Sequence, residues 1–158
     1  FLTINIGDRM RSLVTLLLGC LVALPVSALA TPETEKAFID TYKTAFEGKD
    51  ATTLKSLLYT QGSDPQALEF YTMMMTAEMG GKISSIELKD LTPEDQKKAT
   101  AIMPSPDGGQ AKLNLIPTKK LHLKIDVSDA NGTSSSTSET FVALQDGKFV
   151  IPVPGPVK

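Results

Sequence analysis

The chain has 158 residues, of which 41% are hydrophobic and 22% are charged, and these values are typical of one globular domain. Its formal net charge is -2, so it lacks the basic excess by which a nucleic-acid-binding protein attracts phosphates. A single Cys excludes an intramolecular disulfide framework.

Residues 1–30 have the pattern of a secretory signal peptide. A positive start at Met10-Arg11 precedes the apolar residues 13–24, and small residues follow, ending in Ala28-Leu29-Ala30. The apolar run is shorter than the roughly 20 residues of a membrane span. We expect cleavage before Thr31 and export to the periplasm or the cell exterior. We also expect translation to start at Met10, with residues 1–9 as an over-extended start.

Two other interpretations of this segment stay open. Leu17-Leu18-Gly19-Cys20 resembles a bacterial lipoprotein box, in which Cys20 would carry lipid, although the residues after Cys20 are apolar rather than small and polar. An uncleaved anchor is the other alternative. Because cleavage is the interpretation we prefer, we expect no membrane contact unless Cys20 is lipidated.

Helical periodicity begins directly after this segment. The first helix is expected to open at Pro32, with Thr31 or Thr34 as its cap, and to end at Gly48. Its apolar residues recur at every fourth position and form one stripe, which consists of Phe38, Tyr42 and Phe46.

Two more helices are expected before the pattern changes. Asp50 can cap a short second helix that Gln61-Gly62 closes, and Asp64-Pro65 can open a third helix that runs to Met79. The second half of the third helix, with Met73-Met74-Met75, is apolar on more than one face. We expect it to be covered on two sides, by the sheet and by another helix or a partner subunit. An adaptable, Met-lined binding surface is the alternative.

From Lys82 the hydrophobic period becomes that of strands. Strands are expected at 83–88, 119–127, 134–144 and 149–153, with tight turns at 129–132 and 146–147. Residues 92–94 are expected to form a turn or a single helical turn, and 103–109 a loop. This order predicts one α+β domain over residues 31–158, with three N-terminal helices packed on one face of an antiparallel sheet of four or five strands.

Two stretches of the chain resemble the nuclear transport factor 2-like superfamily, also called cystatin-like α+β. The first is residues 38–54, where an amphipathic helix ends in Gly48 and Asp50 before a short helix with Leu54. The second is residues 141–153, whose Asp146-Gly147-Lys148-Phe149 is similar to the final hairpin of secreted bacterial domains of unknown function, with Phe149 in place of Trp. The resemblance implies a curved sheet around the first helix, a cone-shaped apolar pocket and frequent dimers. The fold itself implies no particular function.

The residues expected to line an apolar cleft between helices and sheet lie on these predicted elements. They are Phe38, Tyr42, Phe46, Tyr71, Met75, Leu123 and Ile125. We expect no catalytic residue, no cofactor and no metal. After residue 30 the chain has a single His, His122, and no Cys, so it cannot supply the ligand set of a zinc site. His122 and Asp126 share the polar face of their strand, opposite Leu123 and Ile125, so His122 is expected to point to solvent or to a subunit interface.

Three functions remain compatible with the sequence. The first is a non-enzymatic binding module that takes a small apolar ligand or a protein partner in the cleft. The second is a small-molecule isomerase or cyclase-like enzyme that uses a pocket Asp, Tyr or His122, as some members of the resembled superfamily do. The third is a dimerisation or accessory module, with the Met-rich third helix or the outer sheet face at a homodimer interface.

Overall fold

The computed structural model describes residues 29–105, 107–130 and 132–157. Residues 1–28 of the expected signal peptide, with Cys20, and Asn131 of the turn expected at 129–132 lie outside the described part of the chain. In chain order, the elements are α1 (Pro32–Glu47), α2 (Ala51–Ser56), β1 (Leu58–Tyr59), α3 (Pro65–Thr76), β2 (Lys82–Asp90), α4 (Pro93–Thr100), β3 (Met103–Pro104), β4 (Gln110–Leu113), β5 (Lys119–Asp129), β6 (Gly132–Gln145), β7 (Lys148–Pro152) and β8 (Pro154–Pro156).

The helices begin at the capping residues that the sequence indicates. Thr31 caps α1, and Thr34 completes a capping box by bonding back to Thr31, so both candidate residues take part. Asp50 caps α2 by accepting a hydrogen bond from one main-chain N–H of the first turn, and Asp64 caps α3 by accepting from two.

The predicted helix ends were less accurate than the starts. α2 ends at Ser56 rather than at Gln61-Gly62, because Leu58–Tyr59 leaves the helix to pair with β7. α3 ends at Thr76, before the expected Met79. Residues 92–94 begin the eight-residue helix α4 rather than a single turn, since Thr92 and Asp95 form a capping box.

The fold is α+β, as predicted, but the main sheet is mixed. Its strand order is β1-β7-β6-β5-β2, and β1 runs parallel to β7 while the other neighbours are antiparallel. The prediction of a wholly antiparallel sheet is therefore wrong at this edge. A second sheet has the order β3-β4-β8. It was missed because its strands have two to four residues each, and β3 and β8 contain Pro.

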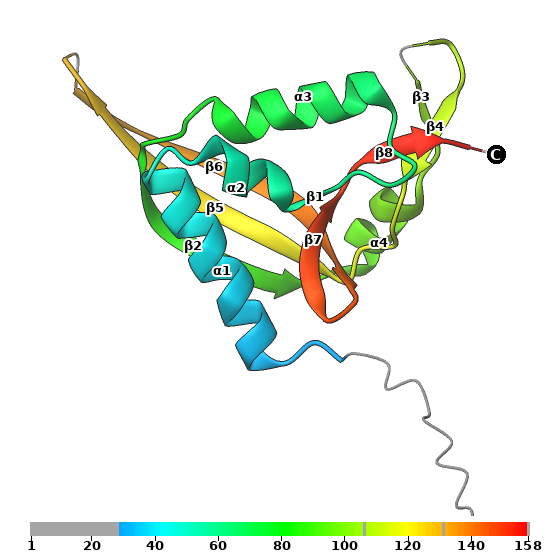
Figure 1. The fold of residues 1–158 in the computed structure, drawn as a ribbon, viewed down its shortest axis with the longest axis horizontal. Coiled ribbons are helices and arrows are strands. Elements are labelled where there is room, and N and C mark those ends of the chain that lie inside the picture. The colour runs from blue at the N-terminus through cyan, green and yellow to red at the C-terminus, as the bar shows by residue number, and fades with distance from the viewer. Residues whose placement is uncertain (1–28, 106, 131, 158) are drawn as a thin grey trace, which may run out of the picture.

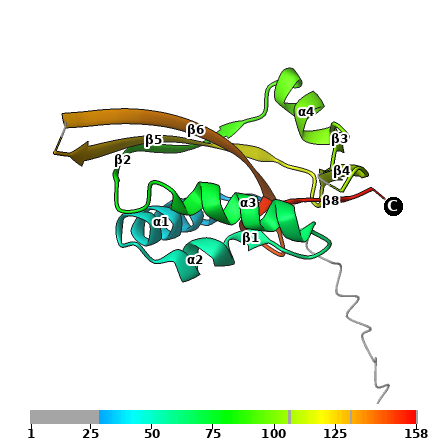
Figure 2. The same cartoon turned by 90° about the horizontal axis from the view of Figure 1, so that it is seen from above.

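The helices and the long strands form separate layers. In Figure 2, α1, α2 and α3 lie on the same side of β2, β5 and β6, while α4 lies apart from them near β3 and β4. Figure 1 shows the hairpin of β5 and β6 projecting beyond the helices.

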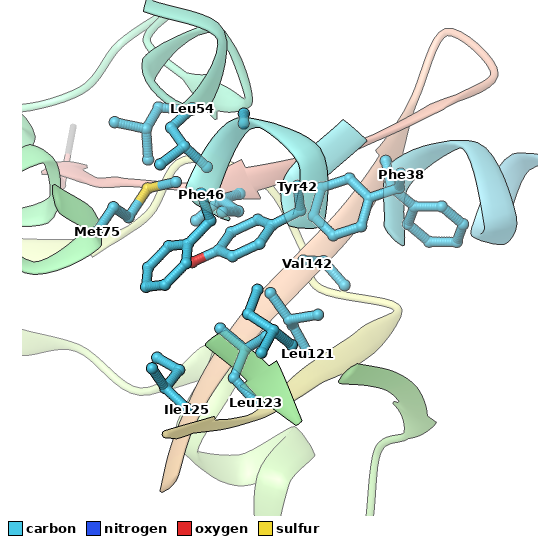
Figure 3. Close-up of a cluster of buried hydrophobic side chains, with 14 of the residues drawn as sticks. Phe38, Tyr42, Phe46, Leu54, Met75, Leu121, Leu123, Ile125 and Val142 are labelled. Atoms are coloured by element: carbon cyan, nitrogen blue, oxygen red, sulfur yellow. The ribbon is translucent and has the colours of Figure 1, made fainter. Parts of the chain in front are cut away.

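The core lies between α1 and β5. Figure 3 shows Phe38, Tyr42 and Phe46 in a row along α1, opposite Leu121, Leu123 and Ile125 of β5. The three β5 side chains are no more than 3% exposed, which confirms the predicted alternation of that strand. Burial of this apolar surface is the main stabilising contribution to the fold.

The Met-rich part of α3 is only partly covered within the chain. Met75 is 8% exposed and belongs to the core, whereas Phe70, Met73 and Met74 are each at least half exposed. This face of α3 is therefore not covered within the described chain, and its cover by a partner subunit stays a prediction.

Candidate functional site

A cavity of about 390 Å³ opens between α1, the end of α2 and the start of β7. We call it the α1–β7 cavity. Its volume falls in the range of roughly 300–1,000 Å³ that is usual for small-molecule sites. It is lined mainly by apolar surface, contributed by Thr34, Ala37, Phe38, Thr41, Ser56, Leu57, Gly147, Lys148, Phe149 and Val150.

The shortness of β1 creates this cavity. β1 pairs with β7 only at Ile151 and Pro152, and the N–H of Ile151 donates to the carbonyl of Leu57 at 2.7 Å. Before Leu57 the chain is still helical, so residues 148–150 have no neighbouring strand on this side within the described structure. The cavity occupies the space that a longer β1 would fill.

Two aromatic rings form the floor of the cavity. Phe38 of α1 and Phe149 of β7 pack edge to face, with ring centroids 6.1 Å apart. Both are less than 5% exposed, because Phe38 lies on the buried stripe of α1 and Phe149 on the buried face of β7. The half-buried Leu57 and Val150 complete the apolar wall.

The polar side chains of the cavity carry three hydroxyls and one ammonium. The hydroxyls of Thr34, Thr41 and Ser56 donate to main-chain carbonyls of their own helices, at 2.6 to 2.8 Å. Their protons are therefore engaged, while each oxygen can still accept a hydrogen bond. Lys148 is the only charged residue in the lining, and its ammonium is the side-chain donor there whose protons are not taken up by a main-chain carbonyl.

The seven residues predicted to line a cleft form part of one hydrophobic cluster. Six of them are buried, and Tyr71 is packed against the cluster at its margin. Of the seven, Phe38 alone reaches the α1–β7 cavity. The other six pack against one another, and a ligand role for them stays a prediction. Burial raises the pKa of Tyr42 to about 12 and also raises the pKa of Tyr71.

The sequence did not point to Leu57, Lys148 and Val150. They lie 19 or more residues from Phe38 along the chain and meet it only because α1 packs beside the start of β7. The Asp146-Gly147 turn signal and the alternation of Phe149 and Ile151 indicated which β7 residues face inward, but not what they face.

The candidate acid–base residues lie outside the α1–β7 cavity. His122 is on the outer face of β5, where its Nδ1 lies 3.2 Å from a carboxylate oxygen of Glu139. Lys120 bridges the same Glu139 to Asp95 of α4, at 3.0 and 3.1 Å. Asp126 accepts a hydrogen bond from Ser135, which lowers the pKa of its carboxyl group. These contacts tie α4, β5 and β6 together.

Three other concavities have carboxylates in their lining. Asp40 and Asp50 lie along one side of α1, Asp90 lies beside α4, and Asp126 lies near the end of α3. Within the described residues, no group of three or more His, Cys, Asp or Glu is placed to hold a metal ion. Of these four concavities, the α1–β7 cavity is the one whose lining is mainly apolar and holds a single cationic side chain.

Comparison with known proteins gives little support for an assignment. No protein-family profile and no curated protein matches the sequence. A solved structure, the helical cell shape determining protein Pgp2 from Campylobacter jejuni, aligns with 75% of this chain and 38% of its own, at 17% identity and a TM-score of 0.40. That likeness is too weak to assign a fold or a function. None of the helices in the described segments has the length and apolar character needed to cross a membrane.

Proposed function

We propose that this chain is an exported, non-enzymatic binding module that takes a small ligand with an apolar body and an acidic end. The observation that carries the proposal is the α1–β7 cavity, in which an aromatic floor lies beside a single ammonium group. Export is part of the proposal and is supported by the signal-peptide pattern of residues 1–30.

The proposed fold relation is to the nuclear transport factor 2-like superfamily. It includes three N-terminal helices on one face of a curved sheet. Its support is the row of Phe38, Tyr42 and Phe46 opposite β5 and the position of α1, α2 and α3 in Figure 2.

The lining of the cavity determines which ligand fits. Phe38, Phe149 and Leu57 favour an apolar body, which gains free energy by leaving water. The hydroxyl protons are engaged, so a ligand anion finds its donor in Lys148. A carboxylate or sulfonate near Lys148 would form a charge-assisted hydrogen bond, which is stronger than a neutral one.

The experiment measures binding of two naphthalene dyes by fluorescence titration. The anionic dye is anilinonaphthalene sulfonate, and the neutral dye is phenylnaphthylamine. Ala37 is exposed and lines the cavity, so Ala37→Phe should fill it and weaken both dyes by roughly tenfold. Lys148→Gln should weaken the anionic dye and leave the neutral dye unchanged.

The matched control is Lys36→Phe. Lys36 precedes Ala37 on α1 and does not line the cavity, so this variant adds the same ring outside the site. Equal loss of dye affinity in the Lys36→Phe and Ala37→Phe variants would contradict the proposal. So would an Ala37→Phe protein that binds both dyes as the parent does.

The isomerase alternative has less support. It needs His122 or an Asp in an apolar cavity, and His122 is instead held by Glu139 on the outer face of the sheet. The dimerisation alternative is taken up below from a different feature of the molecule.

A further inference from the structure

Strand β6 has a long open edge. β5 pairs with β6 along one side, from Val142 to Gly132, but β7 covers the other side only at residues 143–145. Among the described residues, no strand pairs with 133–141 on the β7 side. These nine residues lie in the hairpin that projects beyond the helices in Figure 1.

The geometry of the β6–β7 turn fixes which main-chain groups face this edge. The turn has two residues, Asp146 and Gly147, with φ of 49° and 76°. Such a turn makes Gln145 and Lys148 a pair that exchange main-chain hydrogen bonds. By alternation, the odd-numbered residues of β6 turn their N–H and C=O groups toward the β7 side. From residue 133 to 141 these groups meet no strand.

The open edge lacks the features that usually protect one. Edge strands commonly carry Lys, Pro or a bulge that prevents pairing with another chain. Residues 133–141 contain no Lys and no Pro, seven of the nine are Ser or Thr, and the pairing with β5 has no bulge. All but three of them are exposed.

The strand at the opposite edge of the sheet differs in each respect. β2 carries Lys82, Glu87 and Lys89 on exposed positions, and its register shifts between Ile83 and Ser85. Protection at β2 but not at β6 indicates that the β6 edge is kept free for pairing.

We propose that the β6 edge pairs antiparallel with the same edge of a second copy of this chain, centred on Thr137. An isologous interface requires a surface that complements itself under a two-fold axis. Residues 133–141 meet this requirement, because Gly132 of each copy would lie opposite Val142 of the other, just before the residues of β6 that pair with β7. This inference goes beyond the proposed ligand site, which lies at the opposite end of β6.

The register follows from hydrogen bonding and charge. Pairing about Thr137 matches every odd residue with an odd residue, 133 with 141 and 135 with 139, so all outward main-chain groups find partners. Glu139, the only charged residue of the run, then lies opposite Ser135 rather than opposite its own copy. Ser and Thr side chains facing one another across strands are favourable pairs.

A cysteine placed on the proposed axis tests the register directly. In the full chain with Cys20→Ser, Thr137→Cys puts two thiols opposite each other, at a Cα separation of about 5.5 Å, which a disulfide can span. We expect Thr137→Cys to form a disulfide-linked dimer under mild oxidation. Ser135→Cys alone should not form it, but a mixture of Ser135→Cys and Glu139→Cys proteins should.

Two further variants and one control variant test the dimer in solution by light scattering and sedimentation. Thr137→Pro removes an N–H that points to the open edge and is not bonded to β5, and Pro is tolerated at such positions. It should raise the dimer dissociation constant by roughly tenfold or more. Thr137→Lys keeps the N–H and places the ammonium groups of the two copies opposite each other. It should therefore weaken the dimer more at low salt than at high salt. Thr137→Val should leave the dimer intact.

The proposal is overturned by a parent protein that stays monomeric at about millimolar concentration, where weak complexes form. It is also overturned if Ser135→Cys alone crosslinks as readily as Thr137→Cys, since that places the axis elsewhere. If the edge pairs instead with an extended segment of another protein, the purified chain is monomeric and the proposal fails. Circular dichroism of each variant separates loss of pairing from loss of folding.

Discussion

Tyr42 shows what burial does to a single side chain in this core. Its ring stacks on Phe46 with centroids 6.1 Å apart and lies 6.2 Å from the ring of Phe38. The residue is 4% exposed, so its hydroxyl has little water around it. Desolvation penalises the phenolate and raises the pKa of Tyr42 to about 12.

This raised pKa predicts a loss of stability at alkaline pH. The pKa of Tyr42 in the folded protein lies above the unfolded value of 10.0. The neutral phenol therefore makes its full contribution to the free energy of unfolding below pH 10, and this contribution is lost as the pH rises through about 12. At pH 11.5 the loss is about 2 kcal/mol relative to pH 8. Urea unfolding of the parent and of Tyr42→Phe at both pH values measures it. Tyr42→Phe lacks the titrating phenol of residue 42, so it should lose less stability between these pH values. The titration of Lys and Tyr71 is common to both proteins and cancels in the comparison.

The structural role of some residues could be predicted from the sequence, and that of others could not. The buried stripe of Phe38, Tyr42 and Phe46 repeats with the helical period, so its inward face is a local property of the sequence. Asn114 has no such signal. Its side-chain amide donates to Tyr59 at 2.8 Å and accepts from the N–H of Val153 at 2.9 Å, across 55 and 39 residues. Only the assembled fold gives this residue a role.

At the scale of elements, the start of α3 depends on one carboxylate. Asp64 accepts hydrogen bonds from the N–H groups of Gln66 and Ala67, both at 2.9 Å. Asp64→Ala should lower the free energy of unfolding by about 1 kcal/mol. Asp64→Asn should be nearly neutral, because Asn is an equally good cap. Thermal unfolding compares the two variants with the parent, and equal losses would mean that the carboxylate does not act as a cap.

Elements with a local signal were predicted, and elements that depend on a distant partner were not. The long strand β5 alternates apolar and polar residues over most of its length, and the helices carry caps. β1 has two residues and exists through its pairing with Ile151 and Pro152. β8 is Pro-Gly-Pro, which indicates the end of a strand, yet it pairs with β4. The α1–β7 cavity depends on where β1 begins, so the sequence could not predict it either.

At the scale of the whole molecule, the C-terminal strand β8 connects the start of α3 to the sheet of β3, β4 and β8. The N–H of Asp64, at the start of α3, donates to the carbonyl of Pro154 at 2.8 Å. On its other side, β8 pairs with β4. β8 therefore links α3 to β4, and this link requires close approach of main chains at Gly155.

Gly155 is where this approach is tightest. A Cβ atom there would fall onto the carbonyl oxygen of Gly62, which belongs to main chain and cannot swing aside. Gly155→Ala should therefore separate β8 from the loop that precedes α3, at a cost of about 2 kcal/mol or more. The neighbouring Pro156 is exposed, so Pro156→Ala should change stability by less than about 0.5 kcal/mol. Urea unfolding gives both values, and hydrogen exchange at Asp64 reports whether its bond to Pro154 opens. A Gly155→Ala protein as stable as the Pro156→Ala protein would mean that the loop can move away without loss, and that α3 is held by its contact with the core alone.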